Sequence, residues 1–283
     1  MAALGTMLTA IITPFDENGA VDEDAYVRVL HHVCEHGSDG VVVAGSTGEA
    51  STLTDEEHLR LIALTVQERP AGKTVVAGTG SNDTRHAADM TAKASGLGVD
   101  AILSVTPYYN RPEPRGLVAH YETVARATDK PILLYNIPTR TALDIPNDLL
   151  ARLAQIDNIS GVKQANDDAL APIDGLDLYA GNDNTFARVL DMGGAGGILV
   201  ASHLVGDEMR RIVDEPDRRA EIDAGLQDVY EATGWHNPIP VKKACELLGL
   251  CSGRLRLPLL EADEERTAIL RDALAHHGVL TPA

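Results

Sequence analysis

The sequence predicts an α/β protein with a (β/α)8 barrel over residues 1–224, followed by a helical C-terminal region over residues 225–283. Short apolar runs alternate with longer amphipathic segments as far as about residue 205. The apolar runs are rich in Val, Ile and Leu with little polar alternation, which is typical of parallel strands covered on both faces. Eight such runs favour a closed barrel over a doubly wound sheet. The strand pattern then stops, and only helical patterns follow.

The eight predicted strands are short aliphatic runs between polar or glycine-rich segments. They cover residues 6–12, 40–44, 74–77, 101–105, 131–135, 159–163, 176–180 and 197–200. The seventh has a short pattern, so closure of the barrel depends most on that element.

The intervening segments carry signals for helix starts and stops. Thr54 is a candidate N-cap for the helix that stops at Pro70. Pro146 suits the first turn of another helix. The segment after the sixth strand is predicted to be short or irregular. The longer predicted helices cover residues 22–36, 55–69, 84–97, 116–127, 184–192, 207–233, 240–249 and 263–277.

Composition excludes several classes of function. The formal net charge is −18, which argues against nucleic-acid binding and against attraction to anionic membranes. The N-terminus lacks a basic segment and is interpreted as a first strand, not a signal peptide, and no apolar run reaches membrane-spanning length. The three cysteines have no CxxC spacing, so neither a disulfide framework nor a cysteine zinc site is expected, and a reducing cytoplasm is the predicted location.

Polar and glycine residues gather in the loops after the predicted strands, where barrel enzymes carry their chemistry. The loops that carry them cover residues 45–49, 78–82, 106–112, 135–140 and 181–183. The chain has no phosphate-binding P-loop, no G-x-G-x-x-G dinucleotide motif and no H-E-x-x-H zinc motif. Each loop also has a plainer interpretation, such as a tight turn, and the glycine run at 193–197 could serve close packing alone.

Lys163 closes the sixth predicted strand and is one of only six lysines. Burial at the end of an apolar strand disfavours the ammonium and lowers the pKa of a lysine. A neutral amine can form a Schiff base with a carbonyl substrate. The alternative for this residue taken alone is a lysine paired with a carboxylate.

Together these motifs resemble the dihydrodipicolinate synthase / N-acetylneuraminate lyase family of class I aldolases. The resemblance rests on GSTGE at 45–49, TPYYNRP at 106–112, YNIPTR at 135–140 and GVK at 161–163. NPIPVKKA at 237–244 and LRLP at 255–258 favour the synthase branch. That branch condenses pyruvate with L-aspartate 4-semialdehyde to 4-hydroxy-tetrahydrodipicolinate, without a cofactor or a metal. The resemblance therefore implies a cytoplasmic Schiff-base lyase of lysine and diaminopimelate biosynthesis.

The resemblance also implies roles for particular residues. Lys163 matches the Schiff-base lysine, and Tyr135 matches the proton donor and acceptor beside the imine. Thr47 and Tyr109 match the partners of Tyr135 in a proton relay, with Tyr109 supplied by a neighbouring subunit of a homotetramer built from dimers. The substrate-binding positions of the family correspond here to Ser46, Thr47, Arg140, Gly181 and Ile198.

Arg140 matches the clamp for the carboxylate of the aldehyde substrate. Ser46 stands where the synthases commonly have threonine, a departure shared with sialic-acid lyases. Two other functions stay open: cleavage of N-acetylneuraminate or a 2-keto-3-deoxy sugar acid, and more remotely a barrel that binds a 2-keto acid without catalysis.

In members of the family that lysine inhibits, a regulatory site lies at the dimer interface. The matching positions here are Ala50, Ser51, Asp55, His58, Asn82, His86 and Tyr108. Asp55 replaces a histidine and His86 replaces a glutamate, so the charges that would hold lysine differ. We therefore expect weak or absent feedback inhibition by lysine.

Overall fold

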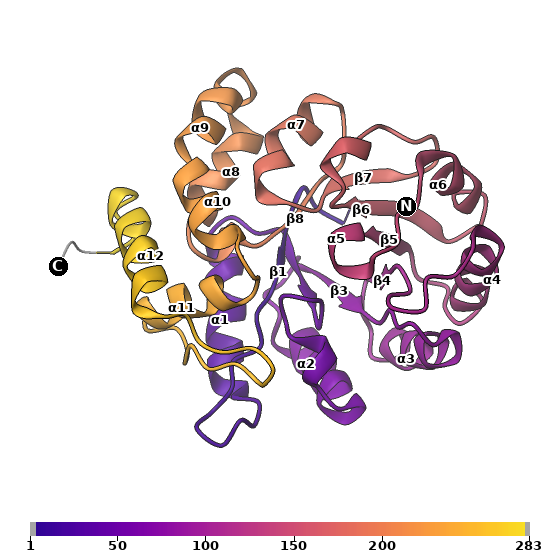
Figure 1. The fold of residues 1–283 in the computed structure, drawn as a ribbon, viewed down its shortest axis with the longest axis horizontal. Helices are drawn as coiled ribbons and strands as arrows, with labels where there is room; N and C mark the ends of the chain where they lie inside the picture. The colour runs from indigo at the N-terminus through magenta and orange to yellow at the C-terminus, as the bar shows by residue number, and fades with distance from the viewer. Residues whose placement is uncertain (1–3, 281–283) are drawn as a thin grey trace.

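The computed structural model describes residues 4–280 and contains a closed barrel of eight parallel strands (Figure 1). Each strand pairs with the next, and β8 pairs with β1 to close the ring. The strands are β1 Met7–Ala10, β2 Gly40–Val43, β3 Thr74–Gly78, β4 Ala101–Val105, β5 Ile132–Asn136, β6 Ile159–Gln164, β7 Asp177–Ala180 and β8 Gly196–Leu199. The predicted fold class is confirmed, including the weakly patterned seventh strand.

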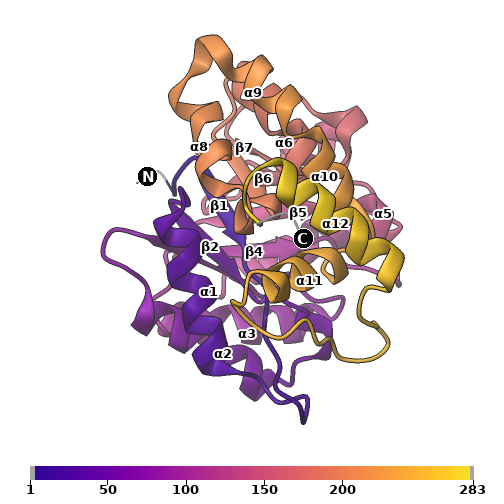
Figure 2. The same ribbon diagram turned by 90° about the vertical axis from the view of Figure 1, so that its left-hand side faces the viewer.

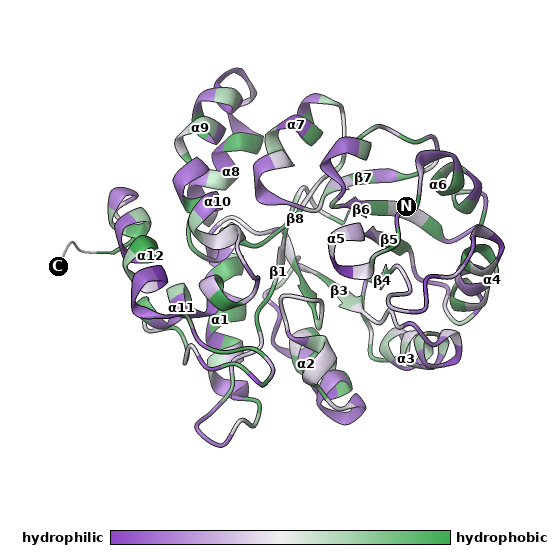
Figure 3. Ribbon diagram, in the orientation of Figure 1, coloured by the Kyte–Doolittle hydropathy of each residue, from purple (hydrophilic) through white to green (hydrophobic). Residues whose placement is uncertain are grey.

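Two hydrophobic clusters follow from the pleat of the strands, because successive side chains point to opposite faces. The smaller cluster fills the barrel and includes Leu8, Val76 and Leu133. The larger one lies between the strands and the surrounding helices. Figure 3 shows hydrophobic residues on the strands and on the helix faces turned toward them, with hydrophilic residues on the outer helix faces.

The glycine run before β8 serves close packing, one of the two interpretations that the sequence left open. A Cβ atom at Gly196 would lie 1.9 Å from the carbonyl oxygen of Thr6. At Gly194 it would lie 2.5 Å from the side chain of Val189. Glycine is therefore required where β7, β8 and β1 approach one another.

The helices that cover the barrel follow the strands in turn. They are α1 Glu23–Glu35, α2 Asp55–Glu68, α3 Thr84–Gly96, α4 Pro114–Ala125, α5 Pro138–Thr141, α6 Asn147–Leu153, α7 Phe186–Asp191 and α8 Gly206–Asp214. Thr54 caps α2 in a reciprocal capping box with Glu57, as predicted. Pro146 is the N-cap of α6, so its prediction as a first-turn residue was wrong by one position. After β6 only a short 3-10 turn forms, at Asp167–Ala169.

The helices that follow the eighth unit are α9 Arg219–Gly225, α10 Gln227–Gly234, α11 Ile239–Leu247 and α12 Glu264–His276. The prediction of one helix over 207–233 was wrong. The chain leaves α8 before Pro216, which begins a short 3-10 turn, because proline lacks the N–H that a continuing helix needs. Figure 2 shows α12 lying along α10 and α11.

The predicted domain boundary at residues 224 and 225 falls in the last turn of α9. No helix in residues 4–280 combines the length and apolarity needed to cross a membrane.

Candidate active site

The loops at the carboxyl ends of the strands hold an unusual share of the strained backbone. Six non-glycine residues among those described adopt positive φ angles. They are Ala44, Glu49, Tyr109, Arg111, Ala142 and His236. All belong to the loops after β2, β4 and β5 or to the segment before α11. Such conformations persist where surrounding structure enforces them, and they gather at functional sites.

Lys163 lies in β6, one residue before its end, and is paired in register with Tyr135 of β5. Only 4% of Lys163 is exposed. Its Nζ lies 4.4 Å from the centre of the Tyr135 ring. Because neighbouring strands in register present their side chains to the same face, the barrel itself brings this amine and this phenol together.

The electrostatics of Lys163 favour a neutral amine. Burial lowers its pKa to about 8, the charge of Asp183 opposes that change, and the guanidinium of Arg140 adds to it. Within residues 4–280 no carboxylate forms an ion pair with Lys163. At slightly basic pH a large fraction of the amine is therefore unprotonated and nucleophilic.

Tyr135 remains a protonated phenol at neutral pH. Burial raises its pKa to about 12, although Arg140 and the nearby Ser46 hydroxyl favour the phenolate. Tyr135 can donate a proton or a hydrogen bond to a group bound at Lys163. It needs a partner before it can accept a proton in return.

Asn237 connects two of the predicted residues. Its Nδ2 donates to Oγ1 of Thr47 at 2.9 Å, and its carbonyl oxygen accepts from Nη2 of Arg140 at 2.7 Å. Its Oδ1 is buried without a hydrogen-bond partner in the described residues, so it can accept from a ligand. Within those residues no hydrogen bond joins Thr47 to Tyr135.

Two residues of this site were not singled out from the sequence. Asn237 appeared only as the first letter of NPIPVKKA. Asp183 appeared only in a loop, yet it is half-buried and accepts hydrogen bonds from the backbone N–H groups of Val200 and Ala201 at 2.9 and 3.2 Å. Two features of the sequence could have pointed to them: Asp183 is a polar residue shortly after a strand, and Asn237 is a polar residue just before a proline-rich helix start.

A cavity of about 680 Å³ opens beside Lys163. The predicted residues Thr47, Tyr135, Arg140 and Gly181 line it. The residues that line it beyond the prediction include Asp183 and Asn237, with Tyr230 of α10. Ile198 is fully buried inside the barrel and is not among the lining residues.

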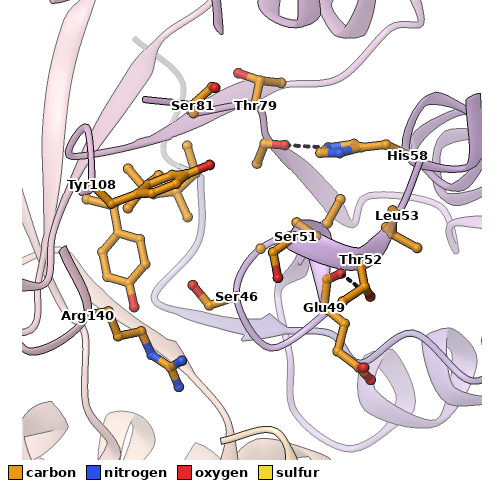
Figure 4. Close-up of a pocket in the computed structure, with 18 of the residues that line it drawn as sticks. Ser46, Glu49, Ser51, Thr52, Leu53, His58, Thr79, Ser81, Tyr108 and Arg140 are labelled. Atoms are coloured by element: carbon orange, nitrogen blue, oxygen red, sulfur yellow. Dashed lines mark hydrogen bonds between the residues drawn. The ribbon is translucent and has the colours of Figure 1, made fainter. Parts of the chain in front are cut away.

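A second cavity of about 450 Å³ adjoins the first and shares Tyr135, Arg140 and Asn237 with it. Ser46 lines this second cavity only. Figure 4 shows Arg140 and Tyr108 on one side of it and His58 on the other. The arrangement provides two adjoining spaces that meet at the phenol and the guanidinium.

The second cavity holds most positions that match the lysine-binding site of regulated family members. Nε2 of His86 lies 3.0 Å from Oδ1 of Asp55, within hydrogen-bonding distance. Burial lowers the pKa of His58, and its Nε2 lies 2.7 Å from the carbonyl oxygen of Gly78 (Figure 4). Ala50, Ser51 and Tyr108 also line the cavity, whereas the carbonyl oxygen of Asn82 accepts from Asn110.

Within one chain, no hydrogen bond joins Tyr109 to Thr47 in the described residues. Tyr109 is 90% exposed and has a φ of 72° in the loop after β4. An exposed aromatic side chain on a strained loop is available to another molecule.

The side chains lining the two cavities form no group of three metal ligands in the described part of the chain. The one such group found there consists of Asp228, His276 and His277, on α10 and at the end of α12.

Comparison with known proteins finds relatives that match nearly the whole chain. The model of the Dihydrodipicolinate synthetase family matches residues 3–277. The 4-hydroxy-tetrahydrodipicolinate synthase of Dehalococcoides mccartyi is 40% identical over 100% of this chain and 99% of that protein.

Solved structures give the same result. The chloride-inhibited dihydrodipicolinate synthase of Acinetobacter baumannii complexed with pyruvate has a TM-score of 0.93 and 34% identity, covering 98% of this chain and 100% of that one. A monomeric dihydrodipicolinate synthase variant has a TM-score of 0.92 and 32% identity, covering 98% of both chains. A full-length family match, a relative of this identity and the same closed barrel lead to one conclusion: the chain belongs to the dihydrodipicolinate synthetase family.

Proposed function

We propose that this protein is a 4-hydroxy-tetrahydrodipicolinate synthase, a lyase that joins pyruvate to L-aspartate 4-semialdehyde through a Schiff base. The observation that carries the proposal is the buried amine of Lys163, 4.4 Å from the ring centre of Tyr135, with a pKa lowered to about 8. The lysine biosynthesis relatives at about 40% identity support the choice of reaction.

In the first step the neutral Nζ of Lys163 attacks the keto carbon of pyruvate. A carbinolamine forms and loses water, which leaves an iminium that withdraws electrons from the adjacent methyl group. Tyr135 supplies the proton that the departing hydroxyl takes. The phenolate left on Tyr135 then takes a proton from the methyl group, which gives the enamine.

In the second step the enamine carbon attacks the aldehyde carbon of aspartate semialdehyde, and the aldehyde oxygen takes a proton from Tyr135 and becomes the hydroxyl of the product. The guanidinium of Arg140 is suited to the carboxylate of that substrate because it offers a planar fork of donors, and only one of its nitrogens is engaged by Asn237. The amine of the substrate then adds to the iminium carbon, releases Lys163 and closes the ring.

The direct test is covalent trapping. The protein is incubated with pyruvate and reduced with borohydride, and the modified peptide is located by mass spectrometry. We expect one adduct per chain on Lys163, and none on the equally buried Lys242, which serves as an internal control. Modification elsewhere, or no adduct, would overturn the mechanism.

The aldehyde substrate is tested separately. Ring formation from pyruvate and aspartate semialdehyde is followed alongside cleavage of N-acetylneuraminate and of 2-keto-3-deoxy sugar acids. Ser46 in place of threonine is the feature that makes this comparison necessary. Faster turnover of a sugar acid than of aspartate semialdehyde would reassign the substrate while leaving the Schiff base intact.

We further propose that Tyr109 completes a proton relay through Thr47 in a neighbouring subunit of a homotetramer. The 90% exposure of Tyr109 supports this, because the chain by itself leaves that side chain in solvent and outside the lining of both cavities. Tyr109→Phe should lower turnover about 10²–10⁴-fold without loss of fold.

Subunit mixing shows where Tyr109 acts. Tyr109→Phe chains and Lys163→Met chains, each nearly inactive, are unfolded together and refolded. If the phenol acts across an interface, a hybrid dimer contains one intact site and activity returns. Unchanged turnover of Tyr109→Phe, or no recovery in hybrids confirmed by native mass spectrometry, would contradict the relay.

The cytoplasmic location predicted from the cysteines stays a prediction.

A further inference from the structure

Four ionisable side chains form a continuous row on the face where α12 meets α10 and α8, outside the catalytic cavity. Oε2 of Glu208 lies 2.9 Å from Nδ1 of His277. Nε2 of His277 lies 2.9 Å from Oδ1 of Asp228, and Oδ2 of Asp228 lies 2.7 Å from Nδ1 of His276. Two imidazoles and two carboxylates thus link residues of α8 and α10 to the end of α12, and Figure 2 shows α12 lying beside α10.

We infer that Asp228, His276 and His277 form a binding site for a divalent transition-metal ion of the zinc class. One donor atom from each residue lies within 4.8 Å of the other two. Two imidazole nitrogens and a carboxylate oxygen are donors that zinc, cobalt, nickel and copper prefer, whereas calcium and magnesium prefer oxygen alone.

The donor spacing is close to what a metal requires. Zinc–nitrogen and zinc–oxygen bonds of about 2.0–2.1 Å in a tetrahedral site place the donors about 3.4 Å apart. The hydrogen-bonded donors therefore need to separate by roughly half an ångström. Donors as far apart as 4.8 Å need to approach by more than an ångström. Side-chain rotation supplies both movements for partly exposed residues. His276 has 73% of its side chain exposed and Asp228 has 39%, so water can complete the coordination.

Glu208 supplies the supporting contact that metal-bound histidines commonly have. A histidine that ligates a metal usually donates its other ring N–H to a carboxylate, which fixes its tautomer and orientation. The contact between Glu208 and Nδ1 of His277 leaves Nε2 as the donor to the metal. The His277 side chain is only 10% exposed, so this orientation is already held by packing.

Without a metal, both ring nitrogens of His277 face carboxylates and each must carry a proton to donate. Burial opposes the charged form, but the hydrogen bonds to Asp228 and Glu208 outweigh it and raise the pKa of His277. A metal at Nε2 displaces one of these protons, so binding strengthens as pH rises.

The site would act on stability and not on the reaction. Asp228 lies on α10, which also contributes Gln227, Tyr230 and Thr233 to the wall of the catalytic cavity. A metal shared by α10 and α12 would hold the C-terminal helix against that wall. Because binding to the folded state alone raises stability by mass action, the unfolding temperature should rise with metal concentration.

The test uses the full-length protein without an affinity histidine tag, stripped with a chelator and titrated with zinc chloride by calorimetry. We expect one equivalent per chain, at least about 10-fold weaker binding in Asp228→Asn and in His276→Asn, and about 10–100-fold weaker binding in Glu208→Gln. Cobalt added to the stripped protein should show the absorption bands of a tetrahedral ion. The control His86→Asn removes a histidine that pairs with a single carboxylate, and it should bind zinc as the unaltered protein does.

Failure of the unaltered protein to bind zinc, or equal affinity in Asp228→Asn and His276→Asn, would overturn the inference and leave the row as a hydrogen-bonded link between helices. Weakened binding in His86→Asn would equally overturn it, since zinc would then be bound elsewhere. Because His276 is largely exposed, its substitution leaves the fold intact and keeps the comparison valid. None of these outcomes bears on covalent trapping at Lys163.

Discussion

Lys163 and Lys242 are both buried lysines, but they differ in the charged groups that surround them. Lys242 is fully buried, and its Nζ lies 2.6 Å from Oε1 of Glu49, which is also buried. Burial lowers the pKa of Lys242, and Glu49 opposes that change. Lys163 has only the unbonded charge of Asp183 in its favour, beside the opposing charge of Arg140. The difference is therefore a carboxylate in direct contact with the amine: Lys242 has one and forms an ion pair, whereas Lys163 has none and is a candidate nucleophile.

The ion pair of Lys242 also holds the loop that carries Thr47. The second oxygen of Glu49 accepts from the backbone N–H of Arg256 at 3.1 Å. Nζ of Lys242 lies 4.2 Å, and the guanidinium of Arg256 4.4 Å, from the centre of the Phe15 ring. The C-terminal region is thus tied to the GSTGE loop by charge, whereas the cavity beside Lys163 stays open.

Of the changes that test this comparison, Lys242→Met should have the largest effect on the free energy of unfolding. Loss of the ammonium leaves the Glu49 carboxylate buried without its partner, which should destabilise the protein by about 3–5 kcal/mol in chemical denaturation at pH 7. Lys243→Met is the matched control, because Lys243 pairs with Glu246 near the surface and should cost about 1 kcal/mol or less. A similar cost for both variants would mean that the buried pair is not special.

Lys163→Met should have the opposite effect on stability while abolishing turnover and the pyruvate adduct. In the folded protein the pKa of Lys163 is about 8 instead of 10.5, so its protonated form opposes folding by about 3 kcal/mol at neutral pH. Methionine removes that penalty. The gain should be complete below pH 8 and fade between pH 8 and 10.5, because the lysine loses its proton first in the folded and then in the unfolded state. Destabilisation at pH 7 would show that Lys163 is held by a favourable charge.

A smaller effect is expected from Asp183→Asn. This change removes the negative charge that favours the Lys163 ammonium but keeps an oxygen to accept from the Val200 backbone. The rate of adduct formation with pyruvate, measured against pH, should have its midpoint near pH 8 in the unaltered protein. The variant should shift that midpoint to lower pH by roughly half a unit. A shift to higher pH would contradict the assigned role of Asp183.

The smallest effect should be the inhibition of turnover by added free lysine. Like Lys163 and Lys242, the ammonium of this ligand would need a carboxylate partner in the protein. In the second cavity Asp55 is already paired with His86, and no glutamate stands at position 86. We expect half-inhibition only above the millimolar range in a steady-state assay. Half-inhibition by sub-millimolar lysine would show that Asp55 exchanges His86 for the ligand.

Much of the fold was predictable because its signals are local. Aliphatic runs predicted all eight strands, and Thr54 and Pro70 delimited α2, since periodicity, caps and breakers act within a few residues. The continuous helix expected over 207–233 was wrong although its breaker is also local: Pro216 stands inside that range, and α8 ends at Asp214 before it. The proximity of Lys163 and Tyr135 was predictable because parallel strands place their carboxyl ends at one rim.

Contacts between distant segments were decided only by the tertiary structure. The sequence alone determined that the chain forms a barrel with an amine and a phenol on adjacent strands. Folding decided that Lys242 meets a carboxylate 193 residues away and that Asn237 reaches Thr47 across 190. It likewise decided that Asp228 lies between two histidines of α12. The physical reason is that the pKa and the partners of a buried group depend on which charges surround it in space, and separation along the chain does not determine that surrounding.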